Sequence, residues 1–280
     1  MKKILREDIL KNLIVVRGGG DIATGTIYKL VKCNYPVIIL ETPNPTAIRR
    51  SVAFSEAVYE KVTKVEDVEC HLVESYEMAL DFLEEGKLPI LVDPQCKILE
   101  KIRPHILIDG ILAKKNLGTE KNMGDFTIAL GPGFEAGKDI DLVIETMRGH
   151  NLGRLIYEGF PKENTGVPGN IGGYTRERVV YSPINGILKS IKKIGDIVEK
   201  EQIIATIQQE KGENIEILSP IKGLLRGIIH DNFQVKKGLK IADIDPREEE
   251  RNNSFTISDK ARCIAGGVLE GIIAYERSKS

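Results

Sequence analysis

The feature that most constrains this chain is a short apolar run followed by three consecutive glycines. Residues 13–16 read Leu-Ile-Val-Val, and the glycines at 18–20 come directly after Arg17. An amphipathic stretch then opens at Asp21, and a second β-branched run occupies 37–40. A strand, a tight turn, a helix and a second strand in this order predict a βαβ unit with parallel strands.

Further apolar runs extend this pattern along the first half of the chain. The runs at 90–92, 106–108 and 126–130 are continuous rather than alternating, and a helical pattern occupies 74–85. Continuous apolar strands are typical of a parallel sheet covered on both faces. The sequence therefore predicts an α/β fold in which a Rossmann-like, doubly wound parallel sheet occupies residues 1–135.

An internal repeat begins near residue 179. Eleven of the 29 positions in 179–207 are identical to the residue 37 positions later, including the Ser-Pro-Ile of 182–184. Two short copies that share a Pro-x-x-Gly turn resemble the halves of a biotinyl/lipoyl-type barrel-sandwich domain, which we expect over 178–247. Those domains carry a modified lysine between the halves. Lys211 lies there without the usual flanking methionines, so we expect an unmodified hairpin tip.

Two other segments complete the predicted organisation. Residues 118–173 hold 12 of the 27 glycines, which predicts β-rich loops over 136–177 that complete a site beside the sheet. Residues 248–280 are expected to form a linker and a C-terminal helix, with Ser258 or Asp259 as its N-cap.

Composition excludes several classes of protein. The 40 basic and 41 acidic residues balance, which argues against a nucleic-acid partner, and no apolar run approaches the length of a membrane span. The four cysteines form no CxxC pair, so we expect neither structural zinc nor a disulfide framework, and no metal site. Cys96 reads as a reduced loop cysteine, with a reactive thiol as the alternative. We therefore expect a cytoplasmic protein, compatible with a homo-oligomer.

The glycine turn is the first candidate site. The residues at 18–23 fit G-x-G-x-x-A, and Glu41 follows about 20 residues later, where it can accept hydrogen bonds from a ribose. Backbone amides at such a helix start can face a phosphate. Asp21, however, can cap the same amides and repels a pyrophosphate. The turn therefore predicts a phosphorylated ligand, with a purely structural turn or a non-phosphate ligand as alternatives.

Other candidates lie in loops after predicted strands. Adjacent arginines at 49 and 50 can clamp an anion, or can be a solvated helix start. His150 can transfer protons, or can be an ordinary hydrogen-bonded histidine. No catalytic residue is assigned. The complete set of predicted binding residues is Gly18, Gly19, Gly20, Asp21, Thr24, Glu41, Arg49, Arg50, Gly131, Gly133, Arg148 and His150.

Several stretches together resemble one family. They include Gly18-Gly19-Gly20-Asp21-Ile22-Ala23, Ala47-Ile48-Arg49-Arg50, Leu130-Gly131-Pro132-Gly133-Phe134 and Arg148-Gly149-His150-Asn151-Leu152. The resemblance is to the YqeB-type accessory proteins of the selenium-dependent molybdenum hydroxylase system, and it spans residues 12–275. It implies a role in the maturation of hydroxylases such as selenium-dependent xanthine dehydrogenase, and it supplies no catalytic residues.

Three functions follow as hypotheses. The first is a cytoplasmic maturation factor that binds the molybdopterin cofactor, a nucleotide or a selenium donor, with the hydroxylase apoenzyme or other maturation proteins as partners. The second is an oxidoreductase that uses NAD(P). The third is a non-enzymatic scaffold that docks through the repeat region.

Overall fold

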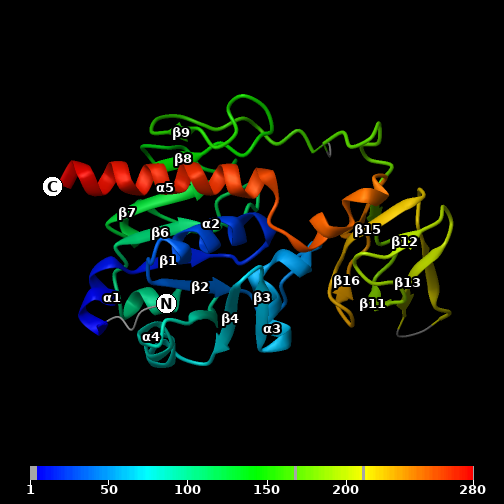
Figure 1. Ribbon diagram of the computed structural model, residues 1–280, viewed down its shortest axis with the longest axis horizontal. Coiled ribbons are helices and arrows are strands. Elements are labelled where there is room, and N and C mark those ends of the chain that lie inside the picture. The colour runs from blue at the N-terminus through cyan, green and yellow to red at the C-terminus, as the bar shows by residue number, and fades with distance from the viewer. Residues whose placement is uncertain (1–4, 167–168, 210–211, 280) are drawn as a thin grey trace. The chain divides into compact units, whose positions relative to one another are not determined.

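The computed structural model describes residues 5–166, 169–209 and 212–279 and divides into two compact units (Figure 1). Unit 1 comprises the described residues of Met1–Pro45, Ala53–Thr165 and Ile257–Ser280. Unit 2 comprises those of Thr46–Val52 and Gly166–Thr256. Lys211 lies outside the described residues, so the expectation of an unmodified lysine stays a prediction.

Unit 1 is built on one nine-stranded mixed sheet of order β3-β4-β5-β2-β1-β6-β7-β8-β9. The inner strands pair in parallel, whereas β3 and β9 at the two edges pair antiparallel with β4 and β8. The strands are β1 (Ile14–Arg17), β2 (Val37–Glu41), β3 (Val62–Val65), β4 (Val68–Val73), β5 (Leu88–Val92), β6 (Ile106–Asp109), β7 (Phe126–Leu130), β8 (Leu142–Ile144) and β9 (Leu155–Ile156).

Helices cover both faces of this sheet. They are α1 (Arg6–Asn12), α2 (Asp21–Lys32), α3 (Ala57–Glu60), α4 (Tyr76–Glu84) and α5 (Asp259–Lys279), with 3-10 turns η2 (Phe54–Glu56), η3 (Lys97–Glu100) and η4 (Lys121–Met123). Because side chains alternate along a strand, Val15 and Leu107 share one face, where they join a core cluster with Ile9 of α1 and Leu83 of α4. The opposite face of β8 packs against α5.

Helices α2 and α5 lie side by side and run in the same direction (Figure 1). Near their starts, a Cβ added to Gly25 would lie 2.7 Å from the Cβ of Ala261. Near their ends, the Tyr35 hydroxyl donates to Glu276 Oε2 at 3.1 Å. The first turns of both helices therefore meet at the carboxyl edge of the parallel strands.

Unit 2 contains two four-stranded antiparallel sheets, of order β10-β17-β15-β12 and β14-β13-β11-β16. The strands are β10 (Val179–Tyr181), β11 (Gly186–Ser190), β12 (Ile197–Val198), β13 (Ile203–Gln208), β14 (Ile215–Leu218), β15 (Gly223–Ile228), β16 (Gln234–Val235) and β17 (Lys240–Asp245). The 3-10 turns η1 (Arg50–Val52) and η5 (Glu248–Phe255) complete the unit. A shift of 37 residues relates β10 to β14 and β11 to β15, so each sheet takes strands from both copies of the repeat.

The predicted fold class is wrong. The large sheet is mixed rather than doubly wound and parallel, because its two edge strands pair antiparallel. It also continues through β8 and β9, which lie beyond residue 135. The repeat forms two separate antiparallel sheets rather than the expected barrel-sandwich-like domain, since pairing between the copies distributes the strands over both sheets. Apolar runs reveal strands, but they do not reveal the direction of pairing.

Within the described residues, no helix combines the length and the apolar character that crossing a bilayer requires.

Candidate functional site

The glycine turn of unit 1 lies between the end of β1 and the start of α2. Protein backbone encloses its first two glycines. A Cβ at Gly19 would lie 2.9 Å from the Ser55 nitrogen, and Gly18, with φ of +89°, faces the backbone of Ile111. Gly20 differs, because no heavy atom lies within 4 Å of the place where its Cβ would be. Gly20 is therefore the position of the turn that an outside group can approach.

Glu41 holds this turn from the end of β2. Its Oε2 accepts a hydrogen bond from the Gly19 nitrogen at 2.8 Å, and its Oε1 accepts one from the Thr42 nitrogen at 2.7 Å. Burial raises the pKa of the Glu41 carboxyl, and the two backbone donors partly offset that rise. Both carboxylate oxygens thus have partners inside the protein, at the place where the sequence pattern predicts a ribose.

Thr24 and Asp21 extend the turn into α2. The buried Thr24 hydroxyl donates to the Gly19 carbonyl at 3.1 Å and accepts from the Phe54 nitrogen at 3.0 Å, so it ties the turn to the 53–56 segment. Asp21 occupies the first turn of α2, and the Gly20 N-cap forms no side-chain capping hydrogen bond. The amides at the start of this helix therefore lack a cap from the Gly20 position.

A buried polar network lies beside the turn. Arg17 and Asp109 end the neighbouring strands β1 and β6, with Arg17 Nη1 3.6 Å from Asp109 Oδ2. The Thr119 hydroxyl donates to Asp109 and accepts from Arg17. Burial raises the pKa of Asp109, against the opposing effects of Thr119 and Arg17. Cys96, also buried, has its pKa raised to about 11 by burial, which keeps the thiol protonated.

The 131–133 and 145–150 loops meet at the ends of β7 and β8. Gly131, with φ of +79°, lies so close to Thr146 that a Cβ would be 2.4 Å from its hydroxyl oxygen. A Cβ at Gly133 would be 2.7 Å from the backbone of Lys115. His150 is exposed, and Arg148 donates to both carboxylate oxygens of Asp259 at 3.0 and 3.2 Å. Gly131 and Gly133 therefore allow close contact with Thr146 and Lys115 within the protein.

Arg49 and Arg50 belong to unit 2 rather than to the unit that contains the glycine turn. Arg49 is buried and donates to the carbonyls of Asn253 and Thr256 at 3.0 and 3.1 Å. Arg50 donates to the Ile228 carbonyl at 3.1 Å. Both guanidinium groups thus bond backbone carbonyls within unit 2.

Lys260 is a site residue that the sequence reasoning missed. It follows the first residue of α5, and its amine interacts electrostatically with Asp21, Glu145, Arg148 and Asp259. Burial and, after it, Arg148 lower the pKa of Lys260, whereas the three carboxylates raise it. The charge of Lys260 is thus influenced both by Asp21, beside the glycine turn, and by the 145–150 loop. No sequence signal marks it, because the proximity of α2 and α5 is a tertiary contact.

Arg17 and Asp109 were also missed, but here a signal exists. Asp109 ends the apolar run 106–108, and Arg17 ends the run 13–16. Polar residues at the carboxyl ends of parallel strands lie at the edge where ligands bind in such sheets.

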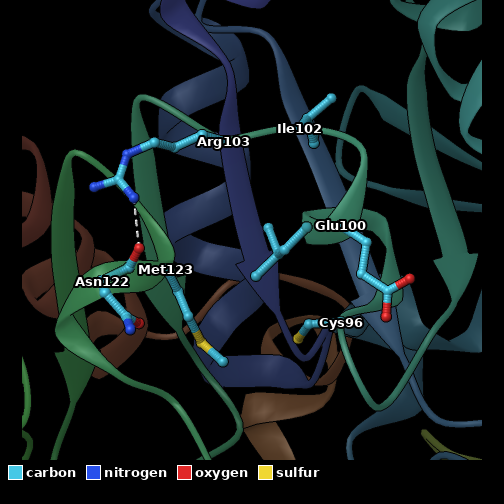
Figure 2. A pocket seen from close by; sticks show the side chains of 7 residues that line it. Cys96, Glu100, Ile102, Arg103, Asn122 and Met123 are labelled. Atoms are coloured by element: carbon cyan, nitrogen blue, oxygen red, sulfur yellow. Dashed lines mark hydrogen bonds between the residues drawn. The ribbon is translucent and has the colours of Figure 1, made fainter.

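A separate open pocket of about 490 Å³ lies between η3 and η4. Figure 2 shows the carboxylate of Glu100 directed away from Arg103. Arg103 donates to the Asn122 and Gly124 carbonyls at 2.6 and 2.5 Å and to Asp125 at 2.7 Å. The guanidinium group of Arg103 therefore holds the 122–125 segment, which forms part of the pocket wall. The lining residues are Cys96, Leu99, Glu100, Ile102, Arg103, Asn122 and Met123.

Comparisons with solved structures find low similarity. An aspartoacylase family protein from Mesorhizobium loti is 13% identical, with a TM-score of 0.30 over 83% of this chain and 84% of that one. A succinylglutamate desuccinylase/aspartoacylase from Rhodobacter sphaeroides is 14% identical, with a TM-score of 0.27 over 83% and 84%. The product-bound ectoine utilization protein EutE (DoeB) from Ruegeria pomeroyi is 12% identical, with a TM-score of 0.24 over 82% of this chain and 56% of that one.

No family model matches the chain. Among curated proteins, the uncharacterized protein YqeB of Escherichia coli K12 is 49% identical over 262 residues, which are 93% of this chain and 47% of that protein. The chain thus spans about half the length of the curated relative it matches. This similarity supports the expected resemblance, and the chain is a homologue of YqeB over nearly all of its own length.

Proposed function

We propose that this protein is a cytoplasmic maturation or accessory factor for selenium-dependent molybdenum hydroxylases. In this role it binds a phosphorylated ligand at the glycine turn: the molybdopterin cofactor, a nucleotide or a selenium donor. Its protein partners would be the hydroxylase apoenzyme or other maturation proteins. The similarity to YqeB supports the family resemblance from which this pathway is inferred.

The observation that carries the ligand proposal is the open position at Gly20. Gly18 and Gly19 face protein backbone, whereas Gly20 is half-exposed and has free space where a side chain would be. It is the N-cap of α2, a helix of 12 residues that begins at Asp21. The start of a helix attracts anions through its backbone amides and its dipole, so the start of α2 at Gly20 favours a phosphate.

Gly20 also permits a clean binding test. Its φ of −66° and ψ of 174° suit any residue, and the space is open, so Gly20→Asp should fold while blocking an anion. We expect pyrophosphate, ADP or molybdopterin to raise the melting temperature of the wild-type chain. At a ligand concentration of 100 times Kd, binding adds about 2.7 kcal/mol to the free energy of unfolding. Gly20→Asp should abolish that shift. Absence of any shift at millimolar concentrations of these ligands would remove the ligand proposal.

Two alternatives are outcomes of the same experiments. A shift with NAD(H) or NADP(H) that exceeds the shift with ADP would favour the oxidoreductase. In a cell that carries the gene and a selenium-dependent hydroxylase, deletion should abolish hydroxylase activity, and the Gly20→Asp gene should not restore it. Restoration by a variant that binds no ligand would favour the scaffold. Unchanged hydroxylase activity after deletion would contradict the maturation role.

A further inference from the structure

A buried hydroxyl group lies between the two charges that end β1 and β6. Thr119 donates a hydrogen bond to Asp109 and accepts one from Arg17, and Arg17 Nη1 lies 3.6 Å from Asp109 Oδ2. All three residues are more than nine-tenths buried. The single hydroxyl oxygen of Thr119 thus gives the carboxylate a donor and the guanidinium an acceptor.

The Arg17–Asp109 pair lies where the strand order of the sheet reverses. β2 follows on one side of β1, whereas β6 and the strands after it lie on the other side. In open α/β sheets, ligands bind beside the carboxyl ends of the strands at this point. A Cβ at Gly18 would lie 3.2 Å from the Cα of Ile111, which is in the loop after β6. The pair is therefore a neighbour of the glycine turn.

Residues 111–119, here called the strap, bring Thr119 to the pair. Thr119 is the only one of these described residues that is buried. The backbone amides of 112–117 donate no hydrogen bond to any residue that the structure describes. Leu112 and Lys114 have φ of +57° and +64°, which is costly for residues with a side chain. Because segments with few backbone hydrogen bonds open at low free energy, the strap can lift while the rest of unit 1 stays folded.

The other bonds of Arg17 in this region are long. Its Nη2 donates to the carbonyls of Leu117 and Pro94, both at 3.4 Å, whereas an ordinary bond of this kind is about 2.9 Å. The strap is also tied to the pair at its other end, where the Ile111 nitrogen donates to Asp109 Oδ1 at 3.1 Å. Of these contacts, only the Thr119 hydroxyl serves both charges of the pair.

We propose that the Arg17–Asp109 pair binds a hydroxyl group of the ligand, such as a sugar hydroxyl, in place of the Thr119 hydroxyl when the strap lifts. A hydroxyl fits because one oxygen has to donate to Asp109 and accept from Arg17. A phosphate or a carboxylate fits poorly, because it donates no hydrogen bond and its charge repels Asp109. This assignment rests on the proposed ligand site and adds the part of it that recognises a sugar, a role that the sequence pattern assigns to Glu41.

The test compares ADP with 2′,3′-dideoxy-ADP by isothermal titration of the full chain. The two nucleotides share the diphosphate and differ in the ribose hydroxyls. Thr119→Ala removes the competing hydroxyl, so this variant should bind ADP about tenfold more tightly than 2′,3′-dideoxy-ADP. Thr119→Ser is the matched control. It keeps the competing hydroxyl, and in this variant and the wild type the two affinities should agree within about threefold. A purely structural role of Thr119 would change both affinities equally.

Limited trypsin digestion measures the lifting of the strap. Trypsin cleaves after lysine, and Lys114 and Lys115 are both exposed. Saturating ADP should speed cleavage at these two bonds in the wild type, because the bound ribose keeps the strap open, whereas 2′,3′-dideoxy-ADP should not. Mass spectrometry of the first fragments identifies the bonds that are cut. Protection of the strap by ADP would overturn the proposal.

The hydroxyl site and the phosphate site can fail separately. Equal affinity of Thr119→Ala for the two nucleotides would reject the hydroxyl site and leave the phosphate site intact. Binding of inorganic pyrophosphate but of neither nucleotide would do the same. If pyrophosphate and both nucleotides fail to bind the wild type, the phosphate site is rejected as well.

Discussion

The carboxylate of Glu41 accepts a hydrogen bond from the backbone nitrogen of Gly19 at 2.8 Å. This bond links the end of β2 to the glycine turn that follows β1. In the sequence, an acidic residue about 20 positions after a glycine-rich turn indicates ribose recognition. In the structure, the same residue satisfies a buried amide of the turn, so Glu41 stabilises the turn itself.

The Glu41–Gly19 bond should contribute measurably to stability. We expect Glu41→Ala to lower the free energy of unfolding by about 1–3 kcal/mol, because it leaves a buried amide without an acceptor. Urea denaturation followed by circular dichroism measures the change. Glu100→Ala, which removes an exposed carboxylate of the same unit, should change the stability by less than about 0.5 kcal/mol. Equal effects of the two variants would contradict the assigned role.

The pH dependence of stability should also report on Glu41. Burial raises its folded pKa above the ordinary value of 4.5, so the folded protein binds more protons than the unfolded chain between the two values. The contribution of Glu41 is therefore most favourable below the unfolded pKa and is lost as the pH rises through the folded pKa. Urea titrations over about pH 4–8 should show this loss in the wild type relative to Glu41→Gln. Parallel curves would show that Glu41 does not titrate in this way.

The buried Arg17–Asp109 pair should be costly to break from one side. Asp109→Ala leaves the guanidinium of Arg17 buried beside Thr119 without its carboxylate, and we expect a loss of about 3–5 kcal/mol. The double variant Arg17→Met/Asp109→Leu removes both charges and should be more stable than Asp109→Ala alone. A double-mutant cycle in urea measures the coupling. Additive losses would mean that the two residues do not interact.

Two glycines in the paired helices should respond in opposite ways to alanine. At Gly25 the new Cβ would lie 2.7 Å from that of Ala261, so Gly25→Ala should destabilise unit 1 by about 1–3 kcal/mol despite its better helix propensity. At Gly266 the nearest atom is Lys29 Nζ at 3.6 Å, so Gly266→Ala should stabilise by about 0.5–1 kcal/mol. Thermal unfolding of both variants measures the contrast. Stabilisation by Gly25→Ala would show that α2 and α5 are not in close contact.

The local elements of the fold were predictable from the sequence. The run 13–16, the glycine turn and the run 37–40 are found as β1, the turn before α2, and β2, because apolar periodicity and glycine act over a few residues. Ser258 was predictable as a cap for the same reason. The internal repeat predicted equivalent strands, and the strands of its two copies do correspond.

The candidate site was only partly predictable. The loops after β1, β7 and β8 were identified from glycines, which mark close backbone approach. The sequence could not show that Gly18 and Gly19 meet protein while Gly20 faces open space. It also could not show that Arg49 and Arg50 donate hydrogen bonds to backbone carbonyls of unit 2, and their predicted role in ligand binding stays a prediction.

The sequence by itself determined where the chain forms strands, helices and tight turns, because those preferences depend on neighbouring residues. Only the tertiary structure decided that β3 and β9 pair antiparallel and that each sheet of unit 2 combines both copies of the repeat. It also decided that Lys260 lies near Asp21. The pairing between the two copies of the repeat and the electrostatic contact of Lys260 with Asp21 join residues far apart in sequence, so no local pattern encodes them. The pairing of β3 with β4 and of β9 with β8 is closer in sequence, but apolar runs do not reveal its direction.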